Sequence, residues 1–216
     1  MALLGLLLDL DDTLVDDRGA TRAAFRAFLT YHGVGRGSNE SELLDRWREI
    51  MARQWERYER GELTFHEQRR ERAREFLGKP LGDAAADEAM RPYFDAYQRS
   101  WALLPDVAVF LARTLHVPKV VVTNGERSQQ LRKLAATGIG THFAGVFAPG
   151  DCGFPKPHPE IFRAAARLIG VPVERCVMIG DDPARDIEPA RALGMRAHRV
   201  EHGNPAAGIL AALDGG

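Results

Sequence analysis

The sequence predicts an α/β fold, with a doubly wound parallel sheet as its core and an all-helical segment inserted after the first strand. Two observations predict this fold. Residues 103–200 alternate short apolar runs with amphipathic helical patterns, and strands that alternate with helices form a parallel sheet covered on both faces. Residues 16–102, in contrast, contain helical patterns only, so they interrupt the alternation directly after its first strand.

The expected strands are short apolar or β-branched runs bounded by turn-forming residues. The first is leucine-rich, ends in aspartate and occupies residues 4–9. The others are residues 119–123, 144–148, 175–180 and 195–200. Helical patterns are expected at residues 106–115, 126–137, 159–170 and 184–194. The last three reach a glycine at or just beyond their ends, which is typical of a helix C-terminus.

Residues 16–102 are expected to form a separate helical domain, and residues 1–15 together with 103–216 to form the α/β core. Thr64 and Glu67 have the spacing of a capping box at a helix start. Pro92 is placed in the first turn of the last helix, where proline is tolerated. Balanced acidic and basic residues favour solvated helix faces over an anion-binding surface. The expected helices are residues 22–33, 41–61, 64–78 and 87–101.

The composition, 45% hydrophobic and 27% charged, is typical of a globular protein with a large core. A formal net charge of −1 gives no reason to expect nucleic acid or an anionic membrane as a partner. The leucine-rich beginning is too short to span a bilayer, and two cysteines cannot form a disulfide framework, so a cytoplasmic protein is expected. Lysine is rare, and the chain has only Lys79, Lys119, Lys133 and Lys156.

Polar residues gather after the expected strands. In an open parallel sheet the carboxyl ends of the strands lie at one edge, and ligands bind outside that edge. Four loops that are far apart in the sequence therefore converge on one site. Their polar residues are Asp9 and Asp11 after the first strand, Thr123, Asn124 and Gly125 after the second, Lys156 after the third, and Asp181, Asp182 and Asp186 after the fourth.

These residue types predict chemistry on a phosphate group. Several carboxylates with one or two main-chain carbonyls form a hard oxygen ligand set that suits Mg²⁺. Thr123 and Asn124 can donate hydrogen bonds to phosphate oxygens, and Lys156 can neutralise the charge of a transferring phosphoryl group. A carboxylate can attack phosphorus, and a second carboxyl two residues further along an extended strand can act as acid and then as base.

In this arrangement the chain resembles a phosphatase of the haloacid dehalogenase superfamily. Four motifs carry the resemblance, in the order in which the family has them. They are DLDDT at residues 9–13, VVTNG at 121–125, the lysine of FPKPHPEIF at 154–162, and GDDPARD at 180–186. The resemblance implies a Rossmann-like core with a helical cap after the first motif, and residues 16–102 match that cap in place and character.

The resemblance also implies roles for the acidic residues. Asp9 is the expected nucleophile, and Asp11 is the expected general acid and base. Asp9, the main-chain carbonyl of Asp11, and Asp181 are the expected Mg²⁺ ligands. Asp12 lies outside the two-residue spacing and is expected to be a turn or cap residue.

The other motif residues are expected to bind phosphate or to support the site. By the same resemblance, Thr123, Asn124 and Lys156 hold the phosphoryl group, and Lys156 is also a catalytic residue. Asp186 is expected to support Lys156 and the water shell of the metal. Asp182 stands where the family often has serine, so it is a candidate for a supporting position or a substitute ligand.

The expected function is Mg²⁺-dependent hydrolysis of a small phosphorylated metabolite through an aspartyl phosphate, by a monomer or a homodimer. Three alternatives remain. A phosphomutase would use the same core. A haloacid dehalogenase releases halide without a proton or a metal, so it would not need Asp11. A phospho-receiver module, the non-enzymatic alternative, typically has no long helical insertion near its first strand.

Overall fold

The computed structural model of the chain describes residues 5–34 and 39–201. Leu4, the first residue of the first expected strand, and residues 202–216 of the expected core lie outside the described residues. The chain forms two compact units, of which one is Arg18–Ser100 and the other consists of the residues before and after it. We call them the helical unit and the α/β unit.

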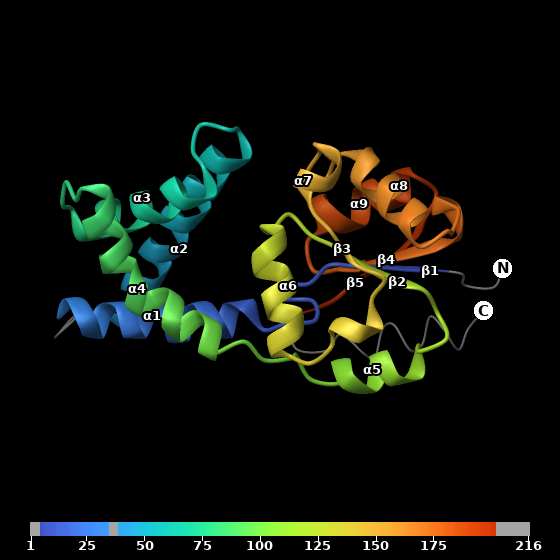
Figure 1. Cartoon of the computed structure of the whole chain (residues 1–216), viewed down its shortest axis with the longest axis horizontal. Coiled ribbons are helices and arrows are strands. Elements are labelled where there is room, and N and C mark those ends of the chain that lie inside the picture. The colour runs from blue at the N-terminus through green and yellow to red at the C-terminus, as the bar shows by residue number, and fades with distance from the viewer. Residues whose placement is uncertain (1–4, 35–38, 202–216) are drawn as a thin grey trace. The chain divides into compact units, whose positions relative to one another are not determined.

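The α/β unit contains a five-stranded parallel sheet with the order β3-β2-β1-β4-β5 (Figure 1). The central strand is β1, in which Leu7 lies opposite Val120 on one side and Met178 on the other. Every expected strand is present, although each is shorter than expected at one end or at both. The strands are β1 (Gly5–Leu8), β2 (Lys119–Val122), β3 (Val146–Phe147), β4 (Cys176–Gly180) and β5 (Arg196–Arg199).

Helices cover both faces of this sheet, which confirms the predicted doubly wound class (Figure 1). Leu6 and Leu8 of the central strand pack in one apolar cluster with α5 and α6. Leu7 points the other way and packs in a second cluster with α8 and α9, because successive side chains of a strand alternate between faces. These helices are α5 (Val107–Arg113), α6 (Arg127–Ala136), α8 (Pro159–Leu168) and α9 (Glu188–Ala192).

The helical unit has its own aromatic core. Trp47 is fully buried, and its ring lies 5.2–5.4 Å from the ring centres of Phe25, Phe28, Phe76 and Tyr93. The expected capping box at Thr64 and Glu67 is present. The helices are α1 (Asp17–His32), α2 (Glu40–Glu59), α3 (Phe65–Leu77) and α4 (Asp83–Arg99).

Three helices of the helical unit, α1, α2 and α4, begin earlier than expected, and for α4 the difference changes an interpretation. Pro92 lies inside α4 rather than in its first turn, so that placement was wrong. The additional first turn contains Asp83, which accepts hydrogen bonds from Arg70 and Arg74 of α3. These contacts link the first turn of α4 to α3, and the sequence pattern of α4 alone does not contain them.

Several short helical segments complete the α/β unit. These segments are η1 (Gly140–His142), α7 (Pro149–Cys152), η2 (Val173–Arg175) and the π-helical turn η3 (Pro183–Ile187).

None of the helices in the described ranges combines the length and the apolar character that a membrane span requires.

Candidate active site

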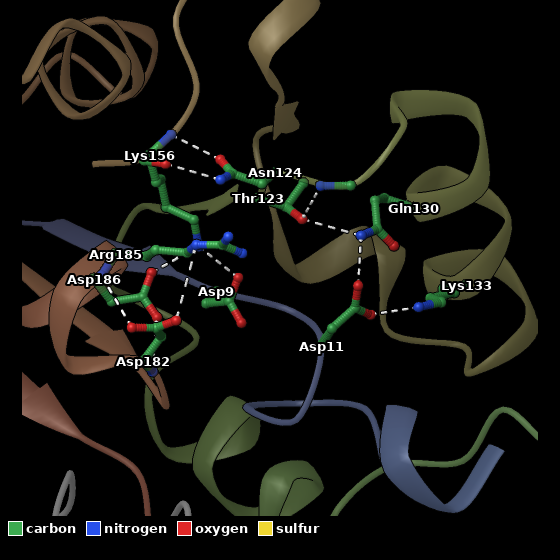
Figure 2. Close-up of polar contacts among 11 residues, drawn as sticks. Asp9, Asp11, Thr123, Asn124, Gln130, Lys133, Lys156, Asp182, Arg185 and Asp186 are labelled. Atoms are coloured by element: carbon green, nitrogen blue, oxygen red, sulfur yellow. Dashed lines mark hydrogen bonds and ion pairs between the residues drawn. The ribbon is translucent and has the colours of Figure 1, made fainter. Parts of the chain in front are cut away.

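Lys156 is a buried cation held between two carboxylates. Its Nζ donates to Oδ1 of Asp9 at 2.6 Å and to Oδ1 of Asp186 at 2.7 Å (Figure 2). Asp9 follows the central strand β1, and its main-chain N–H donates to Ile179 of β4. Lys156 and Asp9 are 5% and 7% exposed, and Asp186 is fully buried. The four-loop convergence predicted from the sequence therefore brings these three side chains into direct contact.

Asp181 joins the same group of acids. One carboxylate oxygen each of Asp9, Asp181 and Asp186 lie within 4.8 Å of one another. Gly180 leaves room for the side chain of Asp186, because a Cβ at position 180 would lie 2.2 Å from Oδ2 of Asp186. Lys156 bonds two of these three carboxylates, so the acids outnumber the lysine, and their oxygen atoms are the donors that Mg²⁺ prefers. The side chains fit a magnesium ion.

The pKa values in this group reflect burial and charge together. Burial raises the pKa of Asp9 to about 6, although the charge of Lys156 acts in the opposite direction. Burial by itself would lower the pKa of Lys156, but the carboxylates of Asp9 and Asp186 raise it above its usual range. Lys156 therefore stays charged, and a bound cation would favour the ionised form of Asp9.

Asp11 has a different set of partners. Gln130 Nε2 donates to its Oδ2 at 2.8 Å, and Lys133 Nζ is bonded to its Oδ1 (Figure 2). Burial raises the pKa of Asp11, and the charge of Lys133 opposes that effect. The side chain of Asp11 is not part of the carboxylate group around Asp181. Asp12 occupies a tight turn with φ of 58°, where its N–H donates to Val15 at 2.7 Å.

Thr123 and Asn124, which were expected to bind phosphate, form hydrogen bonds with other groups of the protein. Thr123 Oγ1 accepts hydrogen bonds from the N–H of Gly125 and from Gln130 Nε2, both at 3.0 Å. The carboxamide of Asn124 bonds the main chain of Lys156 in both directions, donating to its carbonyl at 2.9 Å and accepting from its N–H at 2.7 Å. Asn124 thus fixes the backbone that carries Lys156.

Asp182 acts as a helix cap. Its Oδ1 accepts from the N–H groups of Ala184 and Arg185 at 2.9 and 3.1 Å, and it thereby caps η3. Its own N–H donates to Oδ2 of Asp186 at 3.2 Å. Asp182 therefore supports the position of Asp186, and its carboxylate is outside the group formed by Asp9, Asp181 and Asp186.

Sequence reasoning missed three residues around Asp11, namely Gln130, Lys133 and Asp17. Lys133 Nζ donates to Oδ1 of Asp17 at 2.6 Å as well as to Asp11. The scarcity of lysine was the signal that could have found Lys133, because it is one of the four lysines of the chain. Gln130 and Asp17 gave no comparable signal.

Comparison with known families gives a match over most of the chain. A family model described as haloacid dehalogenase-like hydrolase matches residues 4–194. A phosphoserine phosphatase from Thermus thermophilus is 33% identical, and the match covers 92% of this chain and 88% of that protein. A glyceraldehyde 3-phosphate phosphatase from Methanopyrus kandleri is 31% identical, with 92% of this chain and 84% of that protein covered.

Solved structures give the same fold. The HAD-hydrolase YfnB from Bacillus subtilis, described as bound to magnesium, has a TM-score of 0.80 at 21% identity, with 99% of this chain and 100% of that one covered. A β-phosphoglucomutase from Thermotoga maritima has a TM-score of 0.71 at 18% identity, covering 97% and 91%. An L-2-haloacid dehalogenase from Xanthobacter autotrophicus has a TM-score of 0.70 at 21% identity, covering 99% and 83%. At these identities the similarity demonstrates the fold alone.

Proposed function

Because the chain belongs to the haloacid dehalogenase-like hydrolase family, we propose that it is a Mg²⁺-dependent phosphatase that hydrolyses a small phosphomonoester through an aspartyl phosphate on Asp9. The family membership confirms the resemblance carried by the four motifs. Relatives that are phosphatases support a phosphoric monoester as the substrate. The observation that carries the proposal is the buried group in which Lys156 holds Asp9 at the carboxyl end of the central strand.

In the first half of the proposed reaction, Asp9 attacks the substrate. A carboxylate oxygen of Asp9 forms a bond to phosphorus, and the ester P–O bond breaks with its electron pair going to the leaving oxygen. Protonated Asp11 transfers its proton to that oxygen. Lys156, 2.6 Å from Asp9, neutralises part of the negative charge that develops on the phosphoryl oxygens.

In the second half, water regenerates Asp9. Asp11, now a carboxylate, accepts a proton from the attacking water, whose oxygen forms the new bond to phosphorus. The bond between phosphorus and the Asp9 oxygen breaks, which releases inorganic phosphate. Asp11 ends the cycle protonated, so protons and charges balance over the two halves.

The proposed magnesium site uses the carboxylates of Asp9 and Asp181, with Asp186 beside them. A bound Mg²⁺ would supply charge neutralisation for the phosphoryl oxygens and for the crowded carboxylates. Two features of the chain support this assignment: the oxygen atoms within 4.8 Å of one another, and the burial of Asp9 and Asp186, which makes a nearby positive charge favourable. The carbonyl of Asp11 remains a proposed ligand.

The alternatives differ in what they require of Asp11. Dehalogenation needs no proton donor for the leaving halide, whereas this chain surrounds Asp11 with two side-chain donors. That observation favours phosphoryl transfer. A phosphomutase would use the same residues and return the phosphoryl group to a bound sugar, so only the product distinguishes it from the phosphatase.

The test is phosphate release from a panel of phosphorylated metabolites, including phosphoserine, glyceraldehyde 3-phosphate, nucleotides and sugar phosphates, with Mg²⁺ or with EDTA. We expect release that depends on Mg²⁺ and stops in EDTA. In parallel, haloacids are assayed for halide release, and a sugar phosphate is assayed for isomerisation. Halide release, or isomerisation without phosphate release, would replace the phosphatase by one of its alternatives.

A further inference from the structure

Two buried side chains of α6 (Arg127–Ala136) point at Asp11. Gln130 and Lys133 are three residues apart, so they share one face of the helix, and both are 0% exposed. Their polar ends contact different oxygens of the same carboxylate, with Gln130 Nε2 on Oδ2 and Lys133 Nζ on Oδ1 (Figure 2). Both oxygens of Asp11 are therefore fixed by donors from one rigid element.

Lys133 and Gln130 are themselves held by further contacts. Lys133 Nζ also donates to Oδ1 of Asp17 at 2.6 Å, and it lies 6.0 Å from the ring centre of Trp101. The second donor hydrogen of Gln130 goes to Thr123 Oγ1 at 3.0 Å. The orientation of Asp11 is thus determined by a network that links β1, β2 and α6.

Stability alone does not account for this network. Burying a lysine is unfavourable unless acidic partners compensate it, and apolar side chains of similar volume often replace buried ion pairs without loss of stability. A fixed carboxylate is useful where its direction matters, as it does for proton transfer. Each carboxylate oxygen has two acceptor positions, so Asp11 can hold these two hydrogen bonds and still carry a transferable proton.

We propose that Gln130 and Lys133 are positioning residues that aim the Asp11 carboxyl group at the leaving oxygen of the substrate. This inference rests on the proposed phosphatase function. In the proposed step the proton moves from an Asp11 oxygen to the oxygen of the departing alcohol, while Gln130 and Lys133 keep their own protons and form no covalent bond. Their contribution should therefore depend on how much protonation the leaving group needs.

The experiment compares Lys133→Met and Gln130→Met with Arg132→Met, a matched control on the exposed side of the same helix. Each variant is assayed with Mg²⁺ on p-nitrophenyl phosphate, whose leaving group needs little protonation, and on glycerol 2-phosphate, whose alkoxide must be protonated. The value measured is kcat/KM, because it covers the steps up to departure of the alcohol. Far-ultraviolet circular dichroism checks that each variant is folded.

We expect Lys133→Met and Gln130→Met to lose at least about tenfold more kcat/KM on glycerol 2-phosphate than on p-nitrophenyl phosphate, since a positioned acid contributes about 10²- to 10⁴-fold. Arg132→Met should leave both values unchanged. Equal losses on the two esters, or no loss, would overturn the positioning role. If Lys133→Met does not fold, the losses of kcat/KM that Gln130→Met shows on the two esters are compared in the same way and test the proposal. A wild-type protein that cleaves neither ester, nor any member of the metabolite panel, would instead overturn the proposed function.

Discussion

The two units of the chain differ in the burial of their ion pairs. In the helical unit the cations are mainly arginines at the surface, as in the pairs of Arg70 with Asp83 and Asp87, whose carboxylates are 65% and 51% exposed. The α/β unit has exposed arginine pairs as well, but it also contains Lys133 and Lys156, with side chains 0% and 4% exposed, each of which lies between two acids. Among these ion pairs of the described residues, those with a fully or almost fully buried cation therefore belong to the α/β unit.

The difference predicts which charges matter most for stability and for the proposed function. Exposed pairs contribute little to stability, because water and salt screen them and ordering long side chains opposes them. Buried groups lose their hydration, so each needs its partners, and removing one partner leaves an uncompensated charge. Substitutions that alter charge should therefore have large effects at the edge of the sheet and small effects on the helical unit.

The largest effect is expected for Asp9→Asn compared with Asp45→Asn, the same change at an exposed aspartate of the helical unit. Asparagine at position 9 cannot act as the nucleophile, so turnover of p-nitrophenyl phosphate should fall at least about 10⁴-fold. Asp45→Asn should retain the wild-type rate. Normal turnover by Asp9→Asn would contradict the assignment of the nucleophile.

A large loss of stability is expected for Lys156→Met. The change leaves the buried carboxylates of Asp9 and Asp186 without their cation, and breaking a buried pair in this way costs about 3–5 kcal/mol of unfolding free energy. Urea denaturation measures the loss. Lys79→Met, at an exposed lysine of the helical unit, is the matched control and should unfold as the wild type does. Similar urea denaturation curves for Lys156→Met and Lys79→Met would contradict the expected difference between buried and exposed charges.

A smaller effect is expected from pH in the presence of a chelator. The pKa of Asp9 is about 6 in the folded protein against an ordinary value of 3.8, so the folded state binds this proton more tightly than the unfolded chain does. That stabilisation is complete below pH 3.8 and is lost as the pH rises through about 6. The unfolding free energy of the wild type minus that of Asp9→Asn should therefore fall as the pH rises over this range. A difference that does not change with pH would contradict the raised pKa of Asp9 in the folded protein.

The smallest effect is expected for Arg70→Met in the helical unit. Arg70 bonds both oxygens of Asp87, at 2.8 and 2.7 Å, and one oxygen of Asp83, yet these acids remain in contact with water. The melting temperature should stay close to that of the wild type, and phosphatase activity should not change. A loss as large as that of Lys156→Met would mean that exposure does not separate the two kinds of ion pair.

Much of the α/β unit could be predicted from the sequence because its signals are local. The strands other than β5 are short, mostly apolar runs, and the carboxyl ends of parallel strands must meet at one edge. Asp9, Lys156 and Asp186 follow three different strands, and this rule was enough to bring them together. The strands of this unit were therefore predicted correctly, whereas the single helix expected at residues 184–194 is divided into the π-helical turn η3 and the helix α9.

The partners of these residues could not be predicted, because they depend on the rotation of helices against the sheet. Lys119 and Lys133 are both rare buried lysines, but Lys119 bonds main-chain carbonyls of Thr114 and Val117, whereas Lys133 bonds Asp11. Scarcity alone does not separate the two roles. Asn124 was likewise expected to face the phosphate, and its hydrogen bonds with the Lys156 backbone were not anticipated.

The bond between Asn124 and the Lys156 backbone also bears on the chemical ageing of the protein. Asn124 precedes Gly125, and an asparagine before glycine is a thermolabile sequence that loses its amide nitrogen most readily when the chain is loose. Here the N–H of Gly125 is held by Thr123, and the carboxamide is held at both ends. Deamidation would put a carboxylate oxygen against the Lys156 carbonyl, so the backbone of the proposed catalytic lysine would lose this support while the helices and strands stay intact.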